Sequence, residues 1–193
     1  PPSSELGGSG LAWEAGMSVQ EDVREISQRL NALGGEQPEM ETLVMAGCFI
    51  LCWGKFESIC LPTIGQARPD QDPARYQDSI GHFCAESIQD DTDFTRFEPS
   101  FEHFRRRYRG PIKFTDHFTF LIGNDARAGN VIDDILEREP NSTREKVEAL
   151  LLIAYRLRGN LVHGLKWTSG LQDQVDNFTH ASRVLLGAIE QFR

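Results

Sequence analysis

One stretch decides the fold class: residues 142–161, which read STREKVEALLLIAYRLRGNL. Ser142 and Glu145 have the spacing of a capping box, in which each side chain bonds the backbone N–H of the other residue at the start of a helix. The apolar residues that follow at helical spacing are Leu150, Ala154, Leu157 and Leu161. The stretch therefore predicts a long helix with one buried stripe.

The segments on both sides of this helix are also patterned for helices. A last helix is predicted by a stripe that steps by three and four residues: Val175, Phe178, Ser182, Leu185, Ile189 and Phe192. Earlier helices are predicted over about 18–33, 39–59 and 74–89, on Phe101, Phe104 and Tyr108 before Gly110-Pro111, and from a cap at Asn124 or Asp125 to before Pro140. The chain is therefore predicted to be a single all-α helical bundle over residues 18–193.

Three segments need further interpretation. Residues 39–59 are apolar on most sides, which predicts a buried central helix. Residues 112–122 fit a short helix or a strand, and we favour a helix because no other segment offers a partner strand. Residues 1–17 begin with a run rich in Pro, Ser and Gly, and we expect a flexible tail or an expression-derived remnant.

The composition is typical of a soluble globular protein. Of the 193 residues, 39% are hydrophobic and 25% are charged, which excludes wholesale disorder and a disulfide scaffold. The most apolar run, 43–53, is shorter than the roughly 20 residues of a membrane span, so we expect no membrane embedding. Four cysteines are too few for a disulfide framework and lack a zinc-binding spacing. These features favour a cytoplasmic protein without a metal or another cofactor.

The net charge of −9 argues against a general nucleic-acid coat protein. Basic residues nevertheless gather in two runs that contain no acid. The run 149–172 contains Arg156, Arg158 and Lys166, and the run 103–115 contains Arg105, Arg106, Arg107, Arg109 and Lys113. The arginines of the 103–115 run are candidates for holding an RNA backbone, although a solvated helix face is the more common role of such a run.

Residues 154–164, AYRLRGNLVHG, are the strongest candidate in the chain for a catalytic or ligand-binding segment. On an ideal helix Arg156, Asn160 and His163 form a narrow polar stripe, which suits close approach by a ligand or a second chain. Arg158 lies about 140° from His163 on the same helix. The helical wheel therefore favours Arg156 as the partner of His163.

The run 158–164, RGNLVHG, ends a long helix that is followed by one more helix, and it resembles the Arg-x4-6-His signature of the HEPN superfamily. The resemblance implies an all-α domain. It also implies a metal-independent ribonuclease of a toxin–antitoxin, abortive-infection or CRISPR-associated system, as in many members. The alignment favours Arg158 over Arg156. The chain departs from the family at Gly159, where a polar residue is usual, and Asn160 is the nearest polar group.

The chemistry that the resemblance implies suits these residue types. His163, with an ordinary pKa of roughly 6.5, can take a proton from an RNA 2′-hydroxyl or give one to the leaving 5′-oxygen near neutral pH. The guanidinium of Arg158 can bind phosphate oxygens as negative charge builds on them, and Asn160 could orient the phosphate or the imidazole. The expected product is a 2′,3′-cyclic phosphate. Further candidates for catalysis or phosphate binding are Arg156, Tyr155 and Lys166.

HEPN ribonucleases set the motifs of two protomers face to face, so the resemblance implies a homodimer with a composite cleft. It also implies an RNA substrate and an antitoxin protein as partners. Two alternatives stay open. The basic residues suit the C-terminal end of a helix for electrostatic reasons alone. The domain could also be a non-catalytic HEPN module that dimerises and binds a partner protein or a nucleotide.

Overall fold

The computed structural model describes residues 19–32, 39–61, 73–89, 91–110, 114–138, 141–162 and 173–192. The predicted tail of residues 1–17 lies outside them. Over the described ranges the chain forms helices and no strand, with one isolated bridge between Arg109 and Phe114. The helices are α1 (Val19–Ala32), α2 (Met40–Cys60), α3 (Pro73–Ser87), α4 (Glu98–Tyr108), α5 (Asp116–Ile122), α6 (Ala126–Glu137), α7 (Thr143–Val162) and α8 (Val175–Phe192). The predicted all-α fold is confirmed.

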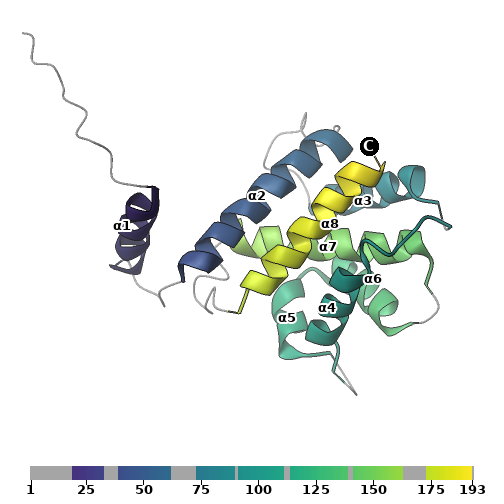
Figure 1. Ribbon diagram of the computed structural model, residues 1–193. Coiled ribbons are helices and arrows are strands. Elements are labelled where there is room, and N and C mark those ends of the chain that lie inside the picture. Colours follow the sequence, from purple (N-terminus) through teal and green to yellow (C-terminus); the bar gives the residue numbers. More distant parts are fainter. Residues whose placement is uncertain are drawn as a thin grey trace, which may run out of the picture.

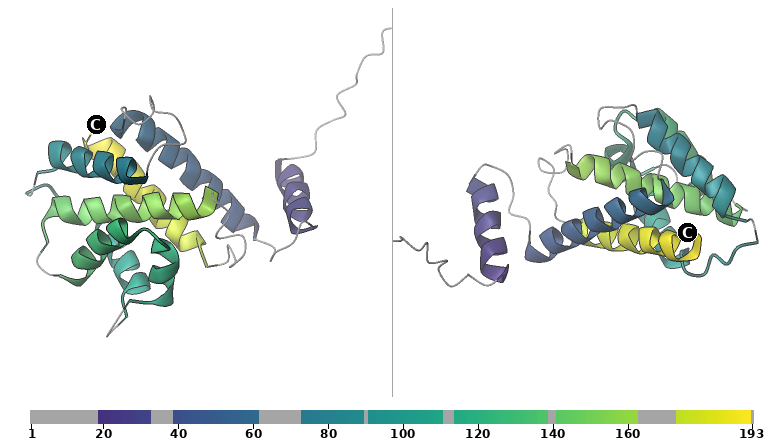
Figure 2. Two further views of the ribbon diagram at one scale, coloured as in Figure 1. Left: turned by 180° about the vertical axis from the view of Figure 1, so that it is seen from behind. Right: turned by 90° about the horizontal axis from the view of Figure 1, so that it is seen from above.

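Helix α7 runs through the middle of the bundle (Figure 1). Helix α3 packs along one side of it, α4, α5 and α6 lie on the opposite side, and α8 crosses it with α2 alongside (Figure 2). Residues 149–155 of α7 are all buried, so the middle of this helix has core on every side. Helix α1 stands apart from the bundle, next to the start of α2.

Two predicted helix starts are confirmed by their hydrogen bonds. The Ser142 N–H donates to Glu145 Oε2 at 2.8 Å, and the Glu145 N–H donates to Ser142 Oγ at 3.3 Å. The Ser142 N–H and hydroxyl both donate to the Glu145 carboxylate, which favours its charged form and lowers the pKa of Glu145. Asp125 caps α6 in the same way and accepts the Ala128 N–H at 3.1 Å.

The segment that fitted a helix or a strand contains helix α5, so the choice of a helix is confirmed. Thr115 caps its start by accepting the Phe118 N–H. Gly123 ends it with a φ of 55°, a left-handed backbone that favours glycine. Helix α6 then packs closely on α5, because a Cβ at Gly129 would lie only 2.9 Å from Ile122 Cγ2.

Helix α2 is not the buried centre that its composition predicted; that position belongs to α7. One side of α2 buries Phe49, Trp53 and Phe56, whereas the opposite side is exposed along the length of the helix. Among the described helices, α2 is long and apolar enough to cross a membrane by length and composition alone. The prediction was wrong because apolar composition does not reveal how many sides of a helix its neighbours cover.

The contact between α2 and α8 should contribute strongly to stability. Phe49 is fully buried and stacks on Phe178, with ring centroids 5.4 Å apart. Phe49→Ala should lower the free energy of unfolding by about 3–5 kcal/mol, because it leaves a large cavity. Urea denaturation followed by circular dichroism measures this change. The control is Phe120→Ala, at a residue that is 63% exposed, with an expected change below about 0.5 kcal/mol. Equal losses of unfolding free energy in the two variants would contradict the packing of Phe49 against Phe178.

Candidate functional site

The candidate motif lies at the C-terminal end of α7, which the structure describes as far as Val162. The predicted site residues placed on this helix are Tyr155, Arg156, Arg158 and Asn160. His163 and Lys166 lie outside the described residues. The description of the site therefore begins with the two arginines of α7, Arg156 and Arg158.

Arg156 is hydrogen-bonded through all three of its nitrogens to its own chain. Nε donates to Leu121 O at 3.3 Å, and Nη2 donates to Ile122 O at 2.8 Å. Nη1 donates to the Asp125 carboxylate at 3.0 Å, and the side chains of this ion pair are only 15% and 12% exposed. The guanidinium is thus directed at α5 and the start of α6, away from solvent.

Asp125 joins three helices through one carboxylate. Besides Arg156 of α7 it accepts Gln77 Nε2 of α3, at 2.9 Å on Oδ1 and 2.8 Å on Oδ2. It also accepts the Ala128 N–H at the start of α6. An ion pair that is largely removed from water loses hydration, and these further hydrogen bonds offset that loss.

Asn160 makes a second attachment to α5. It is 2% exposed, and its Nδ2 donates to Phe120 O at 3.2 Å and to Leu121 O at 3.0 Å. Because the last carbonyls of a helix have no partner within the helix, Asn160 satisfies Phe120 O and shares Leu121 O with Arg156. The polar stripe therefore faces α5 of the same chain. The expectation that Arg156 and Asn160 are open to a second chain is wrong. A helical wheel shows which residues share a side of the helix, but it does not show which other element covers that side.

Arg158 lies on a different side of α7, toward α3. Its guanidinium carbon is 5.9 Å from the centre of the Tyr76 ring, within the range of a cation–π contact. Within the described part of the chain, Arg158 has no hydrogen bond and no ion pair. The neighbouring Gly159 borders open space with respect to the described residues, because a Cβ there would meet none of their atoms within 4 Å. Of the two arginines that the sequence left open, Arg158 is the one not committed by hydrogen bonds.

The Tyr76 ring belongs to an aromatic cluster formed by α2, α3 and α7. Tyr76 stacks on Tyr155 at 5.4 Å, and Trp53 lies 6.3 and 6.1 Å from their centroids. Glu57 accepts the Tyr76 hydroxyl at 2.8 Å and Trp53 Nε1 at 3.0 Å. Burial, together with the bond and charge of Glu57, raises the pKa of Tyr76 to about 12. Tyr155, a predicted candidate for phosphate binding, is buried in this cluster.

The basic run in α4 does not form one uninterrupted electropositive surface. Arg105 lies 3.8 Å from the Glu102 carboxylate, and Arg109 donates to Glu137 at 3.0 Å. Arg106 is exposed. Carboxylates of the same chain therefore oppose two of the four arginines that were candidates for RNA binding.

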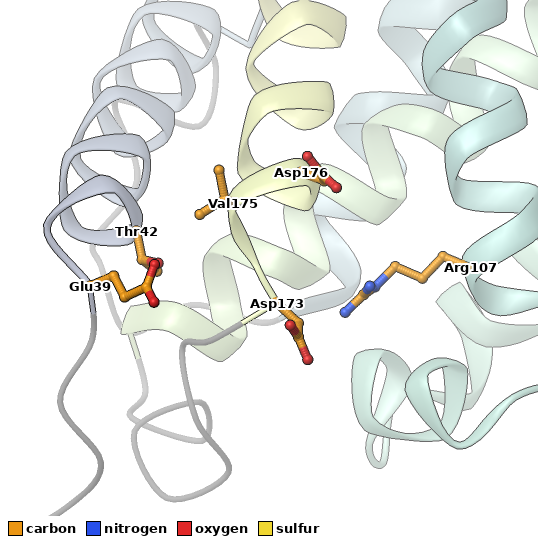
Figure 3. A pocket seen from close by; sticks show the side chains of 6 residues that line it. All are labelled: Glu39, Thr42, Arg107, Asp173, Val175 and Asp176. Atoms are coloured by element: carbon orange, nitrogen blue, oxygen red, sulfur yellow. The ribbon is translucent and has the colours of Figure 1, made fainter.

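Arg107, the remaining arginine of this run, lies at a pocket of about 420 Å³ between α4 and the starts of α2 and α8 (Figure 3). The pocket is lined by Glu39, Thr42, Arg107, Asp173, Val175 and Asp176. Nε and Nη2 of Arg107 are buried, with no hydrogen-bond partner among the described residues. Three carboxylates against one guanidinium give the lining a negative balance, which disfavours an RNA backbone here.

Two histidines for which the sequence predicts no role meet between α4 and α8. The His103 and His180 rings stack with centroids 4.2 Å apart. His103 Nε2 hydrogen-bonds Asn177 Oδ1 at 3.0 Å, and His180 Nδ1 hydrogen-bonds Ser100 Oγ at 3.1 Å. Each ring is thus fixed by a polar side chain of the opposite helix.

This histidine pair is held in its neutral form. Burial, followed by the charge of His103, lowers the pKa of His180 to about 4, and burial also lowers the pKa of His103. Nothing in the sequence pairs α4 with α8, so the stacking could not be predicted.

The described residues contain no group of three or more His, Cys, Asp and Glu side chains arranged to bind a metal. Cys48 is exposed, Cys84 is buried, and Cys52 and Cys60 are half-buried. Burial raises the pKa of Cys60 to about 11 and raises that of Cys84. These two thiols therefore stay protonated at neutral pH and are poor nucleophiles.

Comparison of the chain with known protein families, curated proteins and solved structures gives no match. The functional assignment therefore depends on the sequence motif and on the geometry of α7.

The junction at Asp125 should be essential for stability. Asp125→Ala should lower the free energy of unfolding by about 3–5 kcal/mol, because Arg156 and Gln77 would stay buried without their acceptor. Guanidinium denaturation measures this loss. The control is Arg127→Ala, whose ion pair with Asp78 lies at the surface and should contribute at most about 1 kcal/mol. A loss no larger than in the control would show that Asp125 does not join the helices.

Acid should destabilise the protein through the histidine pair. Between about pH 4 and 6.5, His180 is neutral in the folded protein but protonated in the unfolded chain, which therefore binds more protons. Its contribution to stability is complete above about pH 6.5 and is lost as the pH falls toward 4. The melting temperature of the wild type should thus fall more steeply from about pH 7 to 4.5 than that of His180→Gln. Thermal denaturation measures both slopes, and equal slopes would contradict the lowered pKa.

Proposed function

We propose that this protein is a metal-independent endoribonuclease of the HEPN type, in which Arg158 and His163 act on the RNA phosphodiester. Its proposed role is that of a cytoplasmic toxin or of a defence ribonuclease in abortive infection, controlled by an antitoxin protein. Three features support this proposal together: the motif at 158–164, the all-α fold, and the position of the motif at the end of a long helix that one last helix follows.

The main support for the proposal is that the two arginines of the motif region make different contacts. The guanidinium of Arg156 is bound by two backbone carbonyls and by Asp125. The guanidinium of Arg158 contacts only the face of Tyr76 within the described part of the chain. A catalytic guanidinium must reach the phosphate oxygens as charge builds on them, so it needs free N–H donors. Geometry and motif alignment therefore favour the same arginine.

The proposed reaction is a transesterification within the RNA strand. His163 takes the proton of the 2′-hydroxyl, the 2′-oxygen forms a bond to phosphorus, and the bond from phosphorus to the 5′-oxygen breaks. The leaving oxygen takes a proton from an imidazolium or from water, and a 2′,3′-cyclic phosphate remains. Arg158 offers a planar pair of donors to the phosphate oxygens during this step. As in the family, two copies of the motif are proposed to build one composite cleft.

Asn160 is assigned a positioning role in this proposal. Its amide binds the carbonyls of Phe120 and Leu121, which fixes the last turns of α7 on α5. A buried amide with these partners orients the helix that carries Arg158 and does not touch the substrate itself. Gly159 leaves the backbone between the two side chains open to a ligand.

A non-catalytic HEPN module is the second candidate, and one observation favours it. The polar residue that is usual after the arginine is replaced by Gly159, and the nearest polar side chain, Asn160, is 2% exposed. A domain without that polar group can keep the fold and dimerise while it binds a partner protein or a nucleotide. In that case the wild type would bind its partner and leave RNA intact.

The direct test is cleavage of a labelled RNA panel in EDTA. We expect the wild type to cleave, and we expect Arg158→Ala and His163→Ala each to reduce the rate by about 100-fold or more. Mass spectrometry of the product ends should find the 2′,3′-cyclic phosphate. Arg158→Lys is the matched control for charge, and its rate should stay well below that of the wild type because an ammonium lacks the planar fork.

Folding of each variant is checked by circular dichroism and melting temperature. Arg158→Ala and His163→Ala should melt close to the wild type, whereas Arg156→Ala should be destabilised. A folded wild type that cleaves none of the RNAs would exclude the ribonuclease and leave the binding module. Full activity in His163→Ala would equally contradict the proposed mechanism.

A further inference from the structure

The outer face of α2 is unusually apolar for a surface that no other helix of the described chain covers. Its exposed residues recur at intervals of three and four along the whole helix: Met40, Glu41, Val44, Gly47, Cys48, Leu51, Gly54, Lys55 and Ser58. Leu51 is 76% exposed and Val44 is 51% exposed. Only two of these nine residues are charged. We call these nine residues the α2 outer face.

Within the described residues, the two glycines of this face make no packing contact with another part of the chain. A Cβ at Gly47 or at Gly54 would meet no atom within 4 Å. Glycine in a helix interior is less stable than alanine, so both positions weaken α2 in the isolated chain. A second helix could approach α2 more closely at these two positions than at a residue that carries a side chain.

The spacing of the face fits one arrangement of two α2 helices. Core positions that alternate by four and three residues form the seam of a helix pair. If two copies of α2 run antiparallel about a two-fold axis beside Cys48, each large residue faces a small one of the other copy. Leu51 then lies over Gly47, Val44 over Gly54, and Met40 over Ser58. A parallel pair in register would instead place glycine against glycine and leave voids.

The charges at the edge of the face select the same arrangement. In the antiparallel pair Glu41 of one copy lies beside Lys55 of the other, and the two-fold axis forms this contact twice. Within the described residues neither side chain has an ion pair or a hydrogen bond, so both charges are available. The same axis brings the two exposed Cys48 residues close together.

We propose that the α2 outer face is a homodimer interface, in which two copies of α2 pair antiparallel with Leu51 over Gly47 and Glu41 beside Lys55. The interface is self-complementary in shape and in charge, as a two-fold contact between identical surfaces requires. It uses a different surface from the motif at the end of α7. It therefore does not depend on the proposed ribonuclease activity.

The first test exchanges the charges in the full-length chain and measures the dimer dissociation constant by sedimentation velocity. Glu41→Lys and Lys55→Glu should each raise the dimer Kd by about tenfold, because each places like charges together. The double variant should return to within about threefold of the wild type, because it restores both pairs. A wild type that is monomeric at every soluble concentration, or a double variant as weak as the single ones, would overturn the proposal.

A second test separates this interface from one at the motif. Gly47→Gln, whose side chain enters open space and would fill the seam between two α2 helices, should abolish oxidative cross-linking through Cys48. Gly159→Gln is the matched control: it also replaces a helical glycine that borders open space, but at the motif, and it should keep the Cys48 cross-link. A cross-link lost in Gly159→Gln and kept in Gly47→Gln would overturn the α2 interface.

Cross-linking gives a third readout. Mild oxidation should join two chains through Cys48, and Cys48→Ser should abolish this product while Cys60→Ser keeps it.

Flotation with phosphatidylcholine vesicles tests whether a bilayer covers the α2 outer face instead. A monomer that binds vesicles through Leu51 and Val44 would overturn the homodimer, whereas a dimer that stays off vesicles supports it.

Discussion

The Asp125 carboxylate is the interaction on which the arrangement of the central helices depends. It lies between α5 and α6 and holds Arg156 of α7 and Gln77 of α3. Because an ion pair largely removed from water is tolerated only with nearly complete hydrogen bonding, the positions of these helices are coupled. The same constraint extends to the end of α5. Gly123 turns the chain there, and Asn160 binds the carbonyls that this turn leaves without helical partners.

Around this junction, some polar residues of α7 hold the helix in place, and another is free for the proposed catalytic role. Arg156 and Asn160 secure the helix to α5, while Arg158 projects toward Tyr76 and keeps its N–H donors. A catalytic arginine has to be held in place without being neutralised, and a cation–π contact on a fixed aromatic ring meets both needs. The aromatic cluster is itself fixed, since Glu57 binds the hydroxyl of Tyr76. The proposed ribonuclease thus has a rigid support built from α2, α3 and α7.

Sequence reasoning was sufficient where neighbouring residues decide the outcome. The capping box at Ser142 and the Asp125 cap follow from local spacing, and the structure confirms both. The predicted stripe of α8 is buried at Phe178, Ser182, Leu185 and Ile189, whereas α7 is buried on every side over residues 149–155 and not along the single stripe that its spacing predicted. Contacts between distant segments could not be predicted in the same way. The wheel placed Arg156 on a polar stripe but could not tell that α5 covers it. The apolar composition of α2 predicts complete burial, but one side of the helix is exposed. The stacking of His103 on His180 depends on the packing of α4 against α8, which no local sequence pattern encodes.

In the proposed ribonuclease, Arg156 is structural and Arg158 binds the substrate. NMR of the guanidinium groups in nitrogen-15-labelled His163→Ala protein, titrated with a short RNA that this variant leaves uncleaved, distinguishes the two roles. We expect the Arg156 Nε–H to exchange slowly with water and to keep its chemical shift, because Leu121 O and Asp125 enclose the guanidinium, while the Arg158 signal moves with added RNA. An Arg156 signal that moves with RNA while the Arg158 signal stays unchanged would show that these roles are wrong.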